Sequence, residues 1–139
     1  MAEKIKVAIV GYGNIGRFSL EAAQAAEDFE VVGVVRRDPS KRDDIPAEIP
    51  VAASVAALLE EVKKIDVAIL ATPTRSVEEY AKEILALGIN TVDSFDIHGQ
   101  IPALRKTLDK AAKDGGAVSV MAAGWDPGSD SVVRTLLEA

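Results

Sequence analysis

Cysteine is absent from this sequence of 139 residues, which contains a single histidine and a single tryptophan. Without thiols the chain cannot form disulfides, bind a metal through thiolates or use a cysteine nucleophile. Acidic residues outnumber basic ones by 22 to 16, and no cluster of Lys and Arg occurs. Because nucleic acids and anionic membranes attract clustered cations, we expect neither as a partner.

Long apolar runs are also missing. No run approaches the ~20 residues that span a bilayer, and MAEKIKVAIV lacks a signal-peptide core followed by a cleavage site. We therefore expect a cytoplasmic protein. The length suits one domain with its own core, so we predict a single dinucleotide-binding domain over residues 1–139, and we assign no metal site.

Apolar, strand-like segments alternate with helical patterns along the whole chain, which is typical of parallel βαβ units. This rhythm predicts an α/β fold, a Rossmann-type doubly wound parallel sheet with strand order 3-2-1-4-5-6 and helices on both faces. Ligands then bind beyond the carboxyl ends of the strands. The predicted strands are Ile5–Val10, Phe29–Val35, Val51–Ala53, Asp66–Ala71, Asn90–Phe95 and Ala117–Ala122.

The first strand leads directly into GYGNIG, Gly11–Gly16, and then into a helical pattern. A G-x-G-x-x-G motif is weak evidence alone, but here it has the strand-to-helix context that dinucleotide binding requires. Gly11 permits the tight turn, Gly13 lets a pyrophosphate approach the backbone, and Gly16 lets the helix pack closely on the sheet. The alternative is a glycine-rich turn without a ligand.

Arg36 and Arg37 follow the second strand, where NAD-specific sites usually have an acidic residue. A carboxylate there would repel a 2′-phosphate, whereas one guanidinium can bind it and a neighbouring one can stack on adenine. The pair therefore favours NADP over NAD. The alternative is a solvated turn.

The loop after the fourth strand contains Thr72, Pro73 and Thr74. We expect this loop to face the glycine turn across the switch in strand order. The hydroxyl and backbone groups of these residues suit the nicotinamide ribose, although such residues are also ordinary in loops. Ser76 and Glu79 have the spacing of a capping box and predict that Ser76 caps the next helix.

Two acidic residues follow the fifth and sixth strands: Asp96 in SFDIHGQ and Asp126 in GWDPG. A carboxylate at the mouth of a nicotinamide site can orient an ammonium group and accept its proton. Alternatively, Asp126 is only an N-cap before Pro127, and Trp125 is core. For His98 we favour a loop role over that of a proton donor.

GYGNIG, Arg36-Arg37, TVDSFDIHGQIP and GWDPG together resemble meso-diaminopimelate dehydrogenase. The resemblance covers the whole chain in order, and GWDPG combined with DSFD is far more specific than the glycine motif. It implies an NADP-dependent enzyme of lysine and peptidoglycan biosynthesis. Such an enzyme oxidatively deaminates the D-centre of meso-2,6-diaminopimelate, a small amino-acid substrate.

The resemblance also implies site residues. Asp96, Trp125 and Asp126 would surround the reacting amino acid, and no role is assigned to Gln100, where some members have a second acid. The predicted cofactor site comprises Gly11, Tyr12, Gly13, Asn14, Ile15, Gly16, Arg36, Arg37, Thr72, Pro73 and Thr74.

The family's chain continues into a substrate domain. We therefore expect this chain to bind NADP(H) without turnover, with apolar surface near Trp125 and the last helix that favours a homodimer or fraying. Two other functions stay open: another NADP-dependent dehydrogenase or reductase of amino-acid metabolism, and an NADP(H)-sensing module. GWDPG weighs against the first, and the length of the reading frame distinguishes the second.

Overall fold

Six strands form one parallel sheet in the order β3-β2-β1-β4-β5-β6, as the sequence predicts. The computed structural model describes residues 2–139. The chain divides into two compact units, Met1–Thr72 and Pro73–Ala139, which are described separately below.

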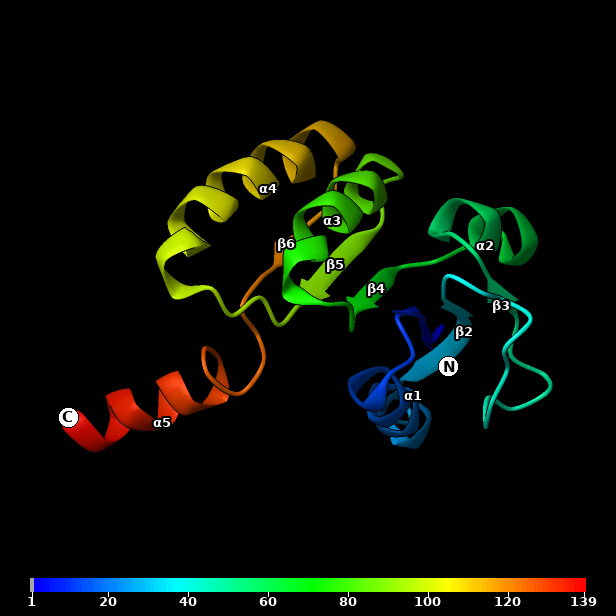
Figure 1. The fold of residues 1–139 in the computed structure, drawn as a ribbon, viewed down its shortest axis with the longest axis horizontal. Coiled ribbons are helices and arrows are strands. Elements are labelled where there is room, and N and C mark those ends of the chain that lie inside the picture. Colours follow the sequence, from blue (N-terminus) through cyan, green and yellow to red (C-terminus); the bar gives the residue numbers. More distant parts are fainter. Residues whose placement is uncertain (1) are drawn as a thin grey trace. The chain divides into compact units, whose positions relative to one another are not determined.

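The first unit contains four strands and two helices (Figure 1). Strand β1 pairs in parallel with β2 on one side and β4 on the other, so the switch in strand order lies within this unit. The elements are β1 (Ile5–Val10), α1 (Asn14–Ala25), β2 (Phe29–Val35), β3 (Val51–Ala52), α2 (Val55–Val62) and β4 (Val67–Leu70).

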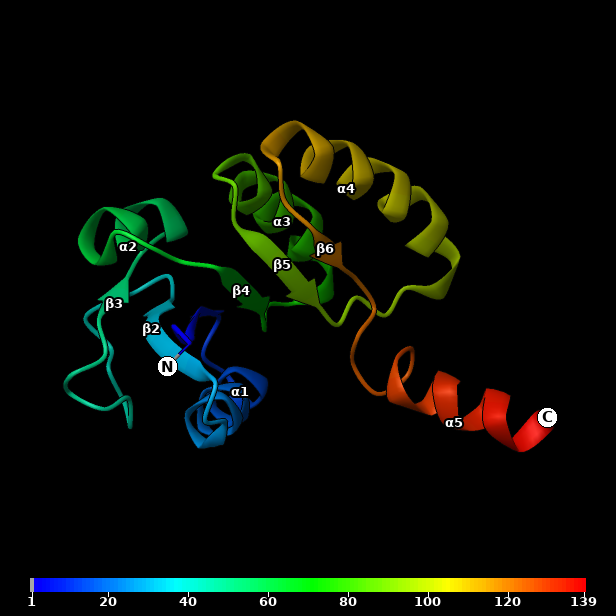
Figure 2. The same ribbon diagram turned by 180° about the vertical axis from the view of Figure 1, so that it is seen from behind.

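Helix α1 packs on β1 and β2, and α2 packs on β2 and β3 from the opposite face (Figures 1 and 2). Residues Val7 to Val10 of β1 are almost completely buried, because a parallel strand covered on both faces needs apolar side chains in both directions. Helix α2 lies very close to β2: a Cβ at Gly33 would collide with the side chain of Leu58. Gly33 therefore sets the distance between this helix and the sheet.

The connection between β2 and β3 is ordered by its own contacts. Ile45 and Ile49 are buried in the core cluster that includes Val7, Ile9, Leu20 and Val34. The guanidinium of Arg42 donates to the carbonyl oxygens of Pro46 and Ile49, at 2.8 and 2.7 Å. This segment is thus a fixed wall at the end of β2 rather than a solvated linker.

The second unit packs two helices side by side on one face of β5 and β6 (Figures 1 and 2). A Cβ at Gly115, at the end of α4, would collide with the Leu85 carbonyl of α3, so glycine permits the close approach of the helices. The elements are η1 (Thr74–Ser76), α3 (Val77–Ala86), β5 (Asn90–Asp93), η2 (His98–Gln100), α4 (Ile101–Gly115), β6 (Ser119–Val120) and α5 (Ser129–Glu138).

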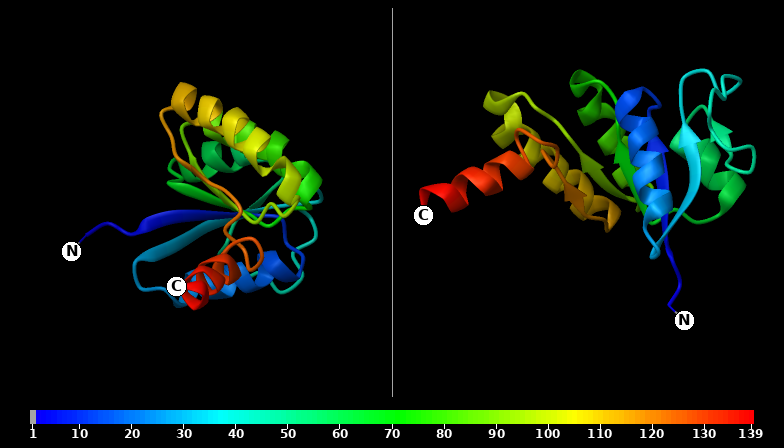
Figure 3. Two further views of the ribbon diagram at one scale, coloured as in Figure 1. Left: turned by 90° about the vertical axis from the view of Figure 1, so that its left-hand side faces the viewer. Right: turned by 90° about the horizontal axis from the view of Figure 1, so that it is seen from below.

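Helix α5 leads away from α3 and α4 (Figure 3). None of its residues is buried, and Leu136 and Leu137 are 70% and 81% exposed. Among the described helices, none is long and apolar enough to cross a bilayer.

Two local predictions are wrong. The side chain of Ser76 makes no cap bond, because the 3-10 turn η1 before α3 leaves Ser76 with helical φ and ψ of −94° and −11° instead of the extended backbone that a side-chain cap needs. Strand β6 is also shorter than Ala117–Ala122. Ala122 has a φ of +56° and donates its N–H to the carboxylate of Asp93, which ends the extended ladder.

Candidate functional site

The glycine turn between β1 and α1 is closed on one side and open on the other. Gly11 has a φ of +95°, and a Cβ there would collide with the carbonyl oxygen of Ala71. A Cβ at Gly16 would collide with the carbonyl oxygen of Gly11. At Gly13, by contrast, a Cβ would have no heavy atom of the described residues within 4 Å. The space over Gly13 can therefore admit a ligand close to the backbone.

Helix α1 begins at Asn14 without a side-chain cap on its Gly13 N-cap. The first N–H groups of a helix have no intrahelical partners and carry the positive end of the helix dipole. Asn14 and Ile15 are exposed, and the first turn contains no acidic residue. This end of α1 therefore favours an anionic group such as a phosphate.

Thr72 ends the first unit beside the glycine turn. Its hydroxyl oxygen is buried and has no hydrogen-bond partner among residues 2–139, and its Cγ2 atom would lie 3.4 Å from a Cβ at Gly11. Buried hydroxyls are nearly always paired. The open space over Gly13 and the unpaired Thr72 hydroxyl together fit a bound dinucleotide.

The two arginines after β2 have different surroundings. The Nη1 atom of Arg36 donates to the Lys41 carbonyl and to Asp43 Oδ2, both at 2.7 Å, and its guanidinium lies 5.7 Å from the centroid of the Tyr12 ring. Arg37 is exposed, and its side chain has no hydrogen bond or ion pair within the described part of the chain. Arg36, whose side chain is 18% exposed, is thus held by its own segment, and its binding of a 2′-phosphate stays a prediction.

Tyr12 connects the glycine turn to the segment after β2. Its hydroxyl donates to Asp44 Oδ1 at 2.9 Å. Burial and this bond raise the pKa of Tyr12 to about 12, so the phenol stays protonated at neutral pH. Sequence reasoning missed Asp43 and Asp44. The only available signal was two adjacent carboxylates a few residues after an arginine pair.

In the second unit, Thr74 and Asp96 are brought together. The Thr74 hydroxyl donates to Asp96 Oδ1 at 2.7 Å, and both side chains are accessible or partly so. Pro73 is exposed at the start of η1. The predicted ribose-binding residue Thr74 therefore contacts the predicted substrate carboxylate directly.

Asp93 is a residue that sequence reasoning missed. It is 3% exposed, and its Oδ1 atom accepts the N–H groups of Phe95 and Ala122 at 2.9 and 3.0 Å. Its Oδ2 atom is buried without a hydrogen-bond partner in the described residues. Asp93 thus connects the end of β5 to the end of β6. The chain continues from β5 to Asp96 and from β6 to Asp126.

Both alternatives for the GWDPG segment are wrong. Helix α5 begins at Ser129 with Gly128 as N-cap, so Asp126 is not the cap and Pro127 is not the first helical residue. The reason is a turn within the segment: Ser129 and Asp130 donate their N–H groups to the carbonyls of Gly124 and Trp125. Trp125 is 70% exposed and is not core.

His98 lies in η2 near this segment. Its Nε2 atom is 3.9 Å from Asp126 Oδ1, and both side chains are accessible. The structure therefore groups two predicted site residues with their neighbours in this unit: Asp96 with Thr74, and Asp126 with His98. Their pairing with the cofactor residues of the first unit remains a prediction.

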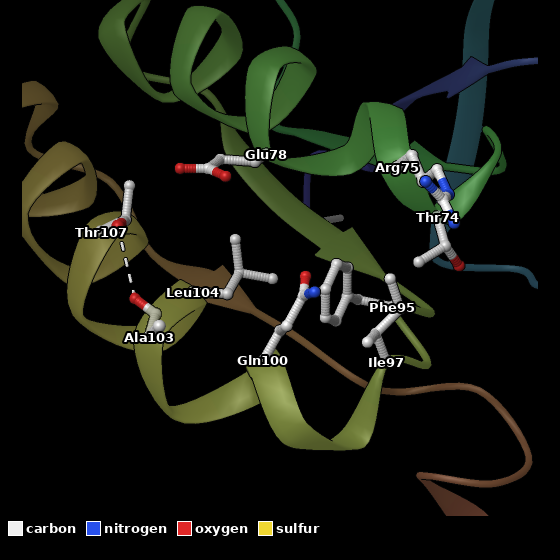
Figure 4. Close-up of a pocket in the computed structure, with 9 residues that line it drawn as sticks. All are labelled: Thr74, Arg75, Glu78, Phe95, Ile97, Gln100, Ala103, Leu104 and Thr107. Atoms are coloured by element: carbon white, nitrogen blue, oxygen red, sulfur yellow. Dashed lines mark hydrogen bonds between the residues drawn. The ribbon is translucent and has the colours of Figure 1, made fainter.

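A pocket of about 630 Å³ lies between the starts of α3 and α4 (Figure 4). Phe95, Ile97 and Leu104 supply apolar lining, and Arg75 and Glu78 supply charged groups. Of the predicted site residues, only Thr74 lines it. The remaining lining residues are Gln100, Ala103 and Thr107.

Comparison with protein families matches residues 5–120 to the Gfo/Idh/MocA model, described as an oxidoreductase family with an NAD-binding Rossmann fold. The chain belongs to this oxidoreductase family. Its Rossmann fold is accordingly an NAD(P)-binding one.

Among the similar proteins, meso-diaminopimelate D-dehydrogenase of Bacteroides fragilis is 63% identical over 137 residues, covering 99% of this chain and 45% of that protein. The enzyme of the same name from Lysinibacillus sphaericus is 40% identical, covering 97% of this chain and 41% of its own. The chain thus spans less than half the length of either relative.

Solved structures of dehydrogenases that act on diaminopimelate or D-amino acids also resemble this chain. Diaminopimelate dehydrogenase of Corynebacterium glutamicum, in complex with diaminopimelate, matches with a TM-score of 0.83 and 31% identity, over 97% of this chain and 41% of that one. An engineered D-amino acid dehydrogenase bound to NADP⁺ matches with a TM-score of 0.81 and 32% identity, over 96% and 40%.

Proposed function

We propose that this chain is the NADP(H)-binding portion of a dehydrogenase that oxidatively deaminates the D-centre of meso-2,6-diaminopimelate. The observation that carries the proposal is the 63% identity to meso-diaminopimelate D-dehydrogenase over almost the whole chain. The exposed GWDPG segment and the contact between Thr74 and Asp96 support it, because both leave carboxylates accessible to a substrate amine.

The cofactor part of the proposal assigns one group of contacts to each part of NADP(H). The N–H groups at the start of α1 would bind the pyrophosphate in the open space over Gly13. The unpaired hydroxyl of Thr72 would bind the nicotinamide ribose. Arg36 and Arg37 would bind the 2′-phosphate and stack on the adenine. When bound, NADP⁺ supplies the acceptor for a hydride.

The substrate part concerns Asp96, Trp125 and Asp126. Asp96 Oδ1 already accepts a hydrogen bond from Thr74, which leaves Oδ2 for the substrate ammonium. Asp126 is the proposed acceptor of the ammonium proton as the carbon gives up its hydride. The resulting iminium ion then takes up water and releases ammonium, leaving the keto acid. The exposed indole of Trp125 would form an apolar wall beside the reacting carbon.

The test is an assay of NADP⁺ reduction by the protein at the length that its reading frame encodes. The proposal predicts saturable reduction with meso-diaminopimelate, and little or none with the L,L isomer, which has no D-centre. Equal rates with both isomers, or no reduction with either, would contradict the proposed substrate. Retained NADP(H) binding in that case would favour a nucleotide-sensing module.

A further inference from the structure

The segment after β2 presents a carboxylate to the arginine that our proposed function assigns to the 2′-phosphate. Asp43 Oδ2 lies 2.7 Å from Arg36 Nη1, and the same nitrogen donates to the Lys41 carbonyl. The Asp43 side chain is 58% exposed and that of Arg36 is 18% exposed. An anion approaching Arg36 therefore meets a guanidinium that already has a negatively charged partner.

The position of Asp43 is fixed by the backbone around it. Its φ of +47° lies in the left-handed region, where Asp and Asn are tolerated better than most residues. On either side, Arg42 bonds the carbonyls of Pro46 and Ile49, and Asp44 accepts the Tyr12 hydroxyl. The carboxylate of Asp43 is thus held beside Arg36.

We propose that Asp43 is a specificity-determining residue, whose carboxylate competes with the 2′-phosphate for Arg36 and so limits the preference for NADP(H) over NAD(H). The inference rests on the proposed function. Exposed ion pairs contribute little to stability, so a phosphate can displace or share this one at a small cost. Like-charge repulsion across one guanidinium still weakens phosphate binding by about three- to tenfold.

Two substitutions remove the charge and keep the backbone. Asn, like Asp, tolerates a positive φ, so Asp43→Asn should keep the backbone conformation. Asp43→Gly keeps that conformation as well and removes the side chain. Glu48→Gln is the matched control, because Glu48 is an exposed carboxylate of the same segment and makes no hydrogen bond or ion pair to Arg36. Thermal unfolding confirms that each variant is folded.

The probes are adenosine 2′,5′-bisphosphate and 5′-AMP, which differ by the 2′-phosphate alone, followed by NADPH and NADH. Calorimetry should show that both Asp43 variants bind the bisphosphate and NADPH about three- to tenfold more tightly than the unmodified chain. Their affinity for 5′-AMP and NADH should not increase, and Glu48→Gln should have less than half of the effect. The gain should shrink as ionic strength rises.

The outcomes distinguish failure of the role of Asp43 from failure of the proposed NADP(H) preference. If the unmodified chain prefers NADPH and the bisphosphate, but the Asp43 variants leave that preference unchanged or lower it, Asp43 is not a competitor and this inference fails alone. An equal gain for all four ligands would also overturn it, because a general change in the segment would then be the cause. If neither the unmodified chain nor the Asp43 variants prefer NADPH to NADH, the proposed cofactor fails and the role of Asp43 fails with it.

Discussion

Thr74 donates its hydroxyl hydrogen to Asp96 Oδ1 across 2.7 Å. The bond joins the loop after β4 to the loop after β5, and so fixes one face of a carboxylate that we assign to the substrate amine. The other oxygen stays available. A single hydroxyl thereby orients a proposed substrate-binding group.

Loss of this hydroxyl should lower activity with little effect on stability. We predict that Thr74→Val in the encoded full-length protein lowers kcat/KM for meso-diaminopimelate about fivefold to tenfold, the scale of one hydrogen bond. Thr74→Ser, which keeps the donor, should stay within about twofold. Equal losses in the Val and Ser variants would show that the hydroxyl alone is not sufficient, and an unchanged Val variant would show that the bond to Asp96 does not matter.

Asp126 should be essential for chemistry and dispensable for folding. Because α5 begins at Ser129, Asp126 is not its cap, and Asp126→Asn should leave the free energy of unfolding nearly unchanged. Its kcat/KM should fall by about 10² or more, as expected for a lost acid–base group. Asp109→Asn, an exposed carboxylate on α4, is the control. Normal turnover by the Asp126→Asn protein would remove Asp126 from the mechanism.

The bond between Tyr12 and Asp44 should give a pH-dependent contribution to stability. Since the pKa of Tyr12 is raised to about 12 from 10.0 in the folded chain, the folded state holds this proton more tightly. The contribution is complete below pH 10.0 and is lost as the pH rises through 12.

The measurement compares the free energy of unfolding of the unmodified chain with that of Tyr12→Phe. The unmodified chain should be more stable by about 1 kcal/mol below pH 10.0, and this advantage should shrink as the pH rises from 10.0 through 12. If the difference in the free energy of unfolding between the two proteins did not change with pH, ionisation of the Tyr12 hydroxyl would not be linked to stability.

Helix α5 should exchange its amide hydrogens much faster than α4. Isolated helices shorter than ~12–15 residues are marginal in water, and α5 has no buried residue, whereas Leu108 of α4 is fully buried. Hydrogen exchange on the 139-residue chain tests this. Protection of α5 that increases with protein concentration would instead support a homodimer formed through its exposed leucines.

Local signals made much of this fold predictable. An apolar run followed by Gly11–Gly16 could be identified because both the strand and the turn are encoded by neighbouring residues. Asp93 and Asp43 could not, because their partners are backbone N–H and guanidinium groups brought near by the fold. Ala122 and Asp93 are 29 residues apart in the sequence, and no pattern announces their bond.

The error at Asp126 has the same origin. Asp-Pro before a helical pattern satisfies local rules for an N-cap, but the turn within Gly124–Gly128 delays the helix to Ser129. The prediction for Ser76 failed in the same way, since the preceding 3-10 turn holds Ser76 in a helical backbone conformation. Local rules name favourable caps, and the hydrogen bonds of the adjoining turn decide whether they are used.

The central claim is that this chain binds NADP(H) in preference to NAD(H) through the pair Arg36 and Arg37. Titration of the 139-residue chain with NADPH and NADH tests it most directly. A charge-assisted bond to the 2′-phosphate contributes roughly 1.5–3 kcal/mol, so NADPH should bind about ten- to a hundredfold more tightly, and Arg36→Asp should abolish that preference. Equal affinity for both cofactors, or equal losses of both in Arg36→Asp, would contradict the account.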